Sequence, residues 1–105
     1  MEKEIMKGGI DILIMSMLRK KDAYGYQIVD EIFNISGRSF NMPEGTLYLA
    51  LKRLQSKGFT ESYKAKAKHG KKVFYHLTDE GVKELNEKLD AWHKFTKLIK
   101  LCSEA

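Results

Sequence analysis

Two short stretches of this sequence carry side chains suited to binding an anion. The first contributes Thr46, Tyr48, Lys52 and Arg53, and the second contributes Lys64, Lys66, Lys68, His69, Lys71 and Lys72. Ammonium, guanidinium and hydroxyl groups donate hydrogen bonds to phosphate oxygens, and Lys or Arg also donates to the O6 and N7 atoms of guanine. The chemistry indicated is recognition of a polyanion.

The excess positive charge is confined to the middle of the chain. Nineteen Lys and Arg residues against fourteen Asp and Glu residues give a formal charge of +5. Residues 43–77 hold eight bases and two acids, whereas residues 1–42 hold six of each and residues 78–105 hold five bases and six acids. A local surplus of this kind favours a nucleic-acid partner over a general effect on solubility.

Catalysis and metal binding are not indicated. His69, His76 and His93 lack the spacing of a metal-binding pair, and the single cysteine, Cys102, forms neither an internal disulfide nor a zinc ligand set. No catalytic residue, metal or cofactor is predicted. A reducing, cytoplasmic location is expected, because the N-terminal segment lacks the continuous apolar run of a signal peptide or membrane span.

Four helices and a hairpin are expected to position these side chains. A chain of 105 residues allows one compact domain. Apolar residues at helical spacing predict helices over 10–18, over 25–33 after a cap at Asp22, and from Pro43, in the first turn, to Lys57. Ile5, Ile12 and Met15 form a weaker second stripe on the first helix, suited to a partner.

Residues 60–66 and 71–77 are rich in Thr, Tyr, Val and Phe, which predicts two strands joined by a tip at 67–70. Thr78 then caps a long helix that reaches about Cys102. Three helices followed by a hairpin and a long helix predict a mainly α (α+β) winged helix-turn-helix, with a two-stranded wing. The expected division is a DNA-binding part over 1–77 and a dimerisation helix over 78–105.

Four segments resemble the PadR family of transcriptional regulators. They are Tyr24-Gly25-Tyr26, the run from Gly45 to Leu54 (GTLYLALKRL), Gly58, and the run from Gly70 to Gly81 (GKKVFYHLTDEG). The resemblance implies a dimeric repressor of the compact subclass, with one C-terminal helix, that in some members releases DNA on binding an aromatic or drug-like compound. Lys71 and Lys72 stand where arginines are typical, which favours phosphate contact over reading of a narrow minor groove.

The third helix is expected to enter the major groove. With its leucines turned inward, its outer face shows Leu49, Lys52, Arg53 and Ser56, flanked by Thr46 and Tyr48. Leu49 suits a thymine methyl group, and the hydroxyls suit phosphate. The alternatives are a solvated helix face and a structural role for Tyr48. The five wing lysines, with His69, are expected to contact the phosphate backbone of the DNA. Tyr24 is a candidate for phosphate contact or helix packing.

The last helix is expected to dimerise through an apolar stripe that one small domain does not cover. The predicted interface consists of Ile12, Leu85, Leu89, Trp92, Phe95 and Ile99. A twofold dimer places its recognition helices about 34 Å apart, so an inverted-repeat duplex is the expected partner. By the family resemblance, Trp92 with Met15 and Leu89 forms a ligand site for a flat aromatic effector, and the alternative is an aromatic anchor in a solid interface.

The alternative function for this chain is that of a winged-helix module that binds another protein and has no sequence-specific DNA binding.

Overall fold

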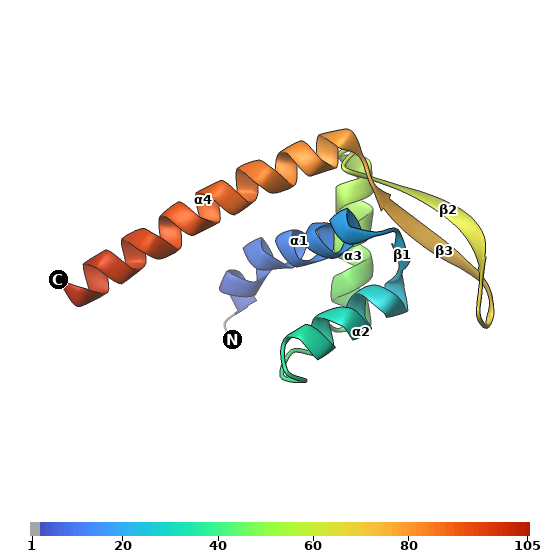
Figure 1. Cartoon of the computed structure of the whole chain (residues 1–105), viewed down its shortest axis with the longest axis horizontal. Coiled ribbons are helices and arrows are strands. Elements are labelled where there is room, and N and C mark those ends of the chain that lie inside the picture. Colours follow the sequence, from blue (N-terminus) through green and yellow to red (C-terminus); the bar gives the residue numbers. More distant parts are fainter. Residues whose placement is uncertain (1–2) are drawn as a thin grey trace.

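The computed structural model describes residues 3–105, with side chains from residue 8 onward, so the side chain of Ile5 lies outside the described part. The elements in order are α1 (Lys3–Lys20), β1 (Ala23–Tyr24), α2 (Gly25–Ile35), α3 (Glu44–Ser56), β2 (Thr60–Ala67), β3 (Gly70–Leu77) and α4 (Asp79–Glu104). Figure 1 shows the β2–β3 hairpin and α4 leaving opposite sides of the three-helix body. This is the winged helix-turn-helix expected from the sequence.

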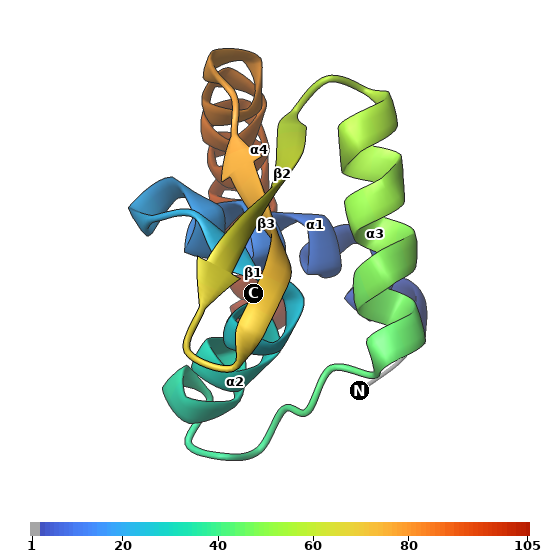
Figure 2. The ribbon, with the colours of Figure 1, turned by 90° about the vertical axis from the view of Figure 1, so that its right-hand side faces the viewer.

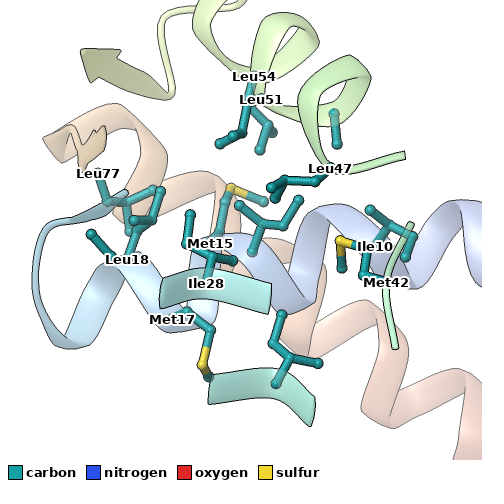
Figure 3. Close-up of a cluster of buried hydrophobic side chains, with 14 of the residues drawn as sticks. Ile10, Met15, Met17, Leu18, Ile28, Met42, Leu47, Leu51, Leu54 and Leu77 are labelled. Atoms are coloured by element: carbon teal, nitrogen blue, oxygen red, sulfur yellow. The ribbon is translucent and has the colours of Figure 1, made fainter. Parts of the chain in front are cut away.

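The core lies where α1, α2 and α3 meet the start of α4. Its fully buried side chains include Ile14 and Met15 from α1, Leu47 from α3 and Leu85 from α4, and Figure 3 shows Met15 among the leucines of α3. Met15 was expected on a stripe facing a partner, and that expectation is wrong. Its neighbour Ile12 is half-buried.

Helix α3 is bounded by two backbone signals. Pro43 is extended and stands at the N-cap position, so α3 begins at Glu44, one residue later than the start expected at Pro43. At the other end, Gly58 adopts a φ of +81°. Its N–H donates to the carbonyl of Gln55 while that of Phe59 donates to Leu54, which is the Schellman arrangement. These bonds turn the chain directly into β2.

A short strand that the sequence analysis missed connects the body to the wing. Ala23 and Tyr24 pair antiparallel with Tyr75 and Phe74, so the sheet order is β1-β3-β2. A two-residue strand carries no alternation to detect. Helix α2 therefore begins at Gly25, with Tyr24 as its N-cap, and Asp22 does not cap it.

The start of α4 is fixed on the turn after α3. The Thr78 hydroxyl accepts from the Gly81 N–H at 3.0 Å and donates to the Gly58 carbonyl at 2.7 Å. A Cβ at Gly81 would lie 2.1 Å from the Phe59 carbonyl oxygen, so only glycine allows this approach. The cap predicted at Thr78 is confirmed.

Only the first turns of α4 pack on the core. Every residue from Asp90 to Ala105 is exposed, and Figure 1 shows this half of α4 projecting beyond the body. The molecule measures 55 × 30 × 21 Å as a result. Within residues 3–105, no helix combines the length and apolar character needed to span a membrane.

Candidate nucleic-acid interface

The outer face of α3 carries most of its predicted contact residues in accessible positions. Leu49 is 67% exposed, Tyr48 is 45% exposed and Lys52 is exposed, whereas Thr46 is half-buried. The inward leucines Leu47, Leu51 and Leu54 leave these positions facing solvent because helix residues three and four apart share a side. This surface offers an ammonium group, hydroxyls and one apolar side chain for a base methyl.

Arg53 differs from its neighbours on α3. Its guanidinium forms a hydrogen-bonded ion pair with the Asp11 carboxylate of α1, and the Asp11 side chain is only 15% exposed. By its position on the helix, Arg53 is an equal candidate with Lys52 for contact with bases. The structure instead gives the Arg53 head group a structural partner and leaves Lys52 without an ion-pair partner among the described side chains.

Tyr48 leans over the first residue of α2. A Cβ on Gly25 would lie 2.5 Å from the Tyr48 hydroxyl oxygen and 3.2 Å from a methyl carbon of Leu47. The Gly25 and Tyr48 positions, which belong to two separate segments of the family resemblance, are therefore in contact. Glycine at position 25 lets α3 approach α2 closely.

The wing lysines divide between two faces of the hairpin. Opposed residues share a face, and the register pairs Ser62 with Tyr75, Lys64 with Val73, and Lys66 with Lys71. Ser62 and Tyr75 line a cavity with α3. Lys64, Lys66 and Lys71 therefore lie on the face of the hairpin that is turned toward α3.

Lys72 lies on the other face of the hairpin. Its ammonium stands 6.0 Å from the centre of the Tyr24 ring, and that ring packs edge-on against Phe74 at 5.3 Å. Of the two roles considered for Tyr24, the structure supports packing. Lys68 and His69 occupy the exposed tip between the strands, so only part of the lysine cluster shares a face with α3.

A cavity of about 490 Å³ separates α3 from the wing, and Figure 2 shows these two elements side by side. Its lining residues are Tyr48, Leu51, Lys52, Gln55, Ser56, Ser62 and Tyr75. Gln55, Ser62 and Tyr75 were not predicted as site residues, because their shared position depends on how the hairpin packs against the helix. Burial, with a smaller contribution from the Tyr48 phenol, raises the pKa of the Tyr75 phenol.

The Asp22 carboxylate holds the base of the wing. It accepts a hydrogen bond from the Tyr63 hydroxyl at 2.6 Å and lies 2.8 Å from His76 Nδ1, so it contacts both β2 and β3. The bond from Tyr63 and the contact with His76 lower the pKa of Asp22. The hydrogen bond to Asp22 and the negative charges of Asp22, Glu61 and Asp79 raise the pKa of His76.

The predicted dimerisation residues separate into core and surface positions. Leu85 is fully buried within the protomer, so its assignment to an interface is wrong. Leu89 is half-buried, whereas Trp92, Phe95 and Ile99 are 38%, 59% and 50% exposed. The apolar surface of α4 therefore begins at Trp92 and continues toward the C-terminus.

An apolar groove of about 510 Å³ opens beside Trp92. It is lined by Gly9, Ile10, Ile12, Leu13, Ile32, Ile35, Ser36, Ser39, Phe40 and Trp92. Met15 and Leu89, which were expected beside Trp92 in a ligand site, are not among the lining residues, and Met15 is completely buried. Leu13, Ile35 and Phe40 were not predicted as lining residues, because they come from separate parts of the chain that only the fold brings together.

Three core helices with a wing and a basic helix–wing face define a winged-helix regulator. Residues 14–87 match the family model of the PadR-like transcriptional regulators. The chain belongs to this family. Because the family consists of transcriptional regulators, this membership confirms the prediction that the protein is not an enzyme. Among the described side chains, no three His, Cys, Asp or Glu residues are grouped to hold a metal ion.

The chain resembles solved regulators over nearly its whole length. A PadR family transcription regulator from Clostridium difficile is 41% identical, with a TM-score of 0.77, and the match covers 89% of this chain and 96% of that one. A transcriptional regulator from Clostridium thermocellum is 31% identical, with a TM-score of 0.87 over 93% and 96% of the two chains. A protein from Lysinibacillus sphaericus is 34% identical over 96% of this chain and 94% of its own length.

Proposed function

We propose that this protein is a homodimeric transcriptional repressor that binds an inverted-repeat DNA site. In this proposal α3 enters the major groove and the wing follows the phosphate backbone. One observation carries the proposal: Lys52 of α3 and Lys64, Lys66 and Lys71 of the wing border the same helix–wing face. Phosphate contacts from such a face supply most of the affinity for a duplex.

The exposed end of α4 supports the dimer. Five large apolar side chains lie exposed within about three turns of this helix, namely Trp92, Phe95, Leu98, Ile99 and Leu101. A group of exposed apolar side chains of this size is typical of a protein interface. We assign residues 1–77 to DNA binding and, within residues 78–105, the part of α4 from Trp92 onward to dimerisation, because Leu85 is buried in the protomer core. A twofold pair presents two recognition helices about one duplex turn apart, which requires an inverted repeat.

Repression follows from occupancy, because a dimer that covers two successive major grooves blocks other proteins from that DNA. A transcriptional regulator must be in the same compartment as the DNA that it binds. We therefore retain the cytoplasmic location expected from the sequence.

The groove beside Trp92 supports the proposal that this protein binds a small aromatic effector. Its walls are almost entirely apolar, and the indole of Trp92 offers a flat face for stacking or for attraction of a cation. Such a ligand changes DNA affinity only if it binds one dimer geometry better than another. Titration of planar cations should quench the fluorescence of Trp92 and shift the affinity for DNA, and unchanged fluorescence across such a set would contradict an effector site here.

DNA binding is tested with the duplex that lies upstream of the protein's own gene. Fluorescence anisotropy should show tighter binding to this duplex than to a shuffled duplex of equal length at physiological salt. Lys52→Glu should abolish the preference and weaken binding to both. Equal affinity for the two duplexes would instead favour the alternative function, a winged-helix module for another protein.

Adjacent wing lysines provide a matched test of orientation. Lys71 lies on the hairpin face turned toward α3, whereas Lys72 lies over Tyr24. Lys71→Gln should reduce the slope of log affinity against log salt by about 0.9, the value for one lost phosphate contact. Lys72→Gln should change this slope less. A larger effect at Lys72 would place the opposite face of the wing on the DNA.

A further inference from the structure

The cavity between α3 and the wing is lined by groups that donate hydrogen bonds. Lys52, Gln55 and Ser56 reach it from α3, and Ser62 and Tyr75 reach it from the wing. None of the described lining residues is Asp or Glu. An ammonium, an amide and several hydroxyls around a space without a carboxylate are complementary to an anion.

These donors are free to bind a ligand. Within the described part of the chain, the side-chain hydrogen bonds and ion pairs involve neighbouring residues such as Arg53 and Tyr63, and none engages a polar side chain of the cavity. A cavity of about 490 Å³ also has room for a tetrahedral anion together with water, each water needing about 30 Å³.

Strand pairing fixes two of the donors. Ser62 and Tyr75 are directly opposed across β2 and β3, so both side chains project from the same face of the hairpin toward α3. The Tyr75 phenol is protonated near neutral pH and able to donate, and burial raises its pKa further. The Tyr48 ring meets the same space from α3. Donors from three elements therefore converge without a change in the fold.

We infer that this cavity is a seat for one phosphate group of the DNA backbone in each half-site. Lys52 supplies the positive charge, and the hydroxyls of Ser56, Ser62 and Tyr75 donate to the non-bridging oxygens. The inference rests on the proposed function and extends it to residues outside the lysine cluster. A phosphate held between helix and wing sets how far α3 enters the groove, because contacts to phosphate fix register and orientation.

Salt-dependent binding tests the seat with the full-length chain. The probe is a fluorescent duplex of mixed sequence, about two helical turns long. Lys52→Gln should lower the slope of log affinity against log salt by about 0.9. The double variant Ser56→Ala with Ser62→Ala removes donors but no charge, so it should weaken binding about tenfold with little change in slope.

A charge placed in the cavity provides the most direct comparison. Ser62→Asp puts a carboxylate among the donors, whereas Asn34→Asp introduces a carboxylate at an exposed position of α2, outside the cavity and the helix assigned to dimerisation. Both changes alter the net charge equally. Ser62→Asp should weaken duplex binding at least about tenfold more than Asn34→Asp, as expected for a like charge facing a phosphate. Circular dichroism melting checks that each variant is folded.

The outcomes separate the seat from the proposed function. If the wild type binds the duplex and Lys71→Gln weakens it, but the cavity variants bind normally, the protein binds DNA and the seat is wrong. If the wild type binds no duplex, the proposed function fails and the seat fails with it.

A free phosphate ion offers the same oxygens as the DNA backbone, so the ligand source needs its own measurement. We expect the amide resonances of Ser56 and Ser62 to shift with duplex at micromolar concentration and to shift little with inorganic phosphate. Saturable binding of inorganic phosphate that competes with the duplex would instead identify a site for the free ion.

Discussion

Lys52 and Arg53 are adjacent on α3 and have different surroundings. Lys52 borders the cavity beside the wing, whereas Arg53 is paired with Asp11 of α1. Helical periodicity assigns both to the outer half of the helix because successive residues are only about 100° apart. The length of the arginine side chain allows its head group to reach back to α1. Charge type alone therefore does not identify a DNA contact.

We expect Arg53→Ala to destabilise the fold. The substitution leaves the mostly buried Asp11 carboxylate without its partner, which costs about 1–3 kcal/mol. Lys52→Ala is the matched control and should change stability by less than about 0.5 kcal/mol. Urea denaturation of Arg53→Ala, Asp11→Ala and the double variant gives the coupling free energy of the ion pair, and Lys52→Ala is measured in the same way. Equal stability of Arg53→Ala and Lys52→Ala would show that the ion pair contributes nothing to stability.

His76 gives the fold a pH-dependent contribution. Its pKa is raised above the ordinary value of 6.5 by Asp22, so folding favours the protonated imidazole. This stabilisation is fully present below pH 6.5 and is lost as the pH rises through the folded pKa. The urea midpoint of the wild type should therefore exceed that of His76→Asn by more at pH 6 than at pH 8.5.

The Asp22 carboxylate is the expected cause of the His76 shift. In NMR titrations, Asp22→Asn should lower the titration midpoint of His76. Asp30→Asn removes an exposed carboxylate of α2 that is not among the groups that raise the pKa of His76, and it should leave the midpoint unchanged. A His76 midpoint that is the same in Asp22→Asn and in the wild type would remove the carboxylate from this explanation.

At the scale of elements, the junction of α3, β2 and α4 is closely packed. Gly58 turns the chain after α3, and Thr78 and Gly81 then pack against that turn. Each residue belongs to a segment that resembles the family pattern. These segments therefore have structural roles in addition to any role in binding, since they set the direction in which α4 leaves the body.

We expect Gly81→Ala to be strongly destabilising. The new Cβ overlaps the Phe59 carbonyl oxygen, and relief requires movement of backbone, at a cost of about 3 kcal/mol or more. Gly45→Ala is the control, because nothing lies within 4 Å of a Cβ at that helical position. It should leave stability unchanged or raise it by up to about 1 kcal/mol. Thermal melting compares the two, and a mild effect at Gly81 would contradict the close packing.

For the whole molecule, the unequal packing of α4 is the dominant feature. Its first turns complete the protomer core through Leu85, and its second half extends into solvent with Phe95 and Ile99 exposed. One apolar stripe thus serves two purposes along its length. The sequence indicates the apolar stripe, but it does not show where α4 passes from the core into solvent. That position depends on where the three-helix body ends.

We expect Phe95→Gln with Ile99→Gln to dissociate the proposed dimer. Four apolar side chains are lost per twofold interface, so the dimer dissociation constant should rise at least about a hundredfold. The melting temperature should also lose its dependence on protein concentration. Lys97→Gln, a change at an exposed charged position of the same helix, is the control. Sedimentation velocity measures assembly, and a wild type that is already monomeric would refute the dimer.

The sequence by itself determined the helices, the wing, the cap at Thr78 and the basic segment over 43–77. These features depend on periodicity, turn chemistry and charge, which act between residues close together in the chain. The resemblance to PadR regulators rested on the same segments, and the family match confirmed it.

Only the tertiary structure decided which residues of these elements share a surface. Arg53 meets Asp11 across 42 positions and Tyr63 meets Asp22 across 41, and no local pattern records such contacts. The same packing buried Met15 and Leu85, divided the wing lysines between two faces, and brought Ser62 and Tyr75 beside Lys52. The physical reason is that a side chain's direction follows from its own element, whereas its partner depends on how separate elements pack.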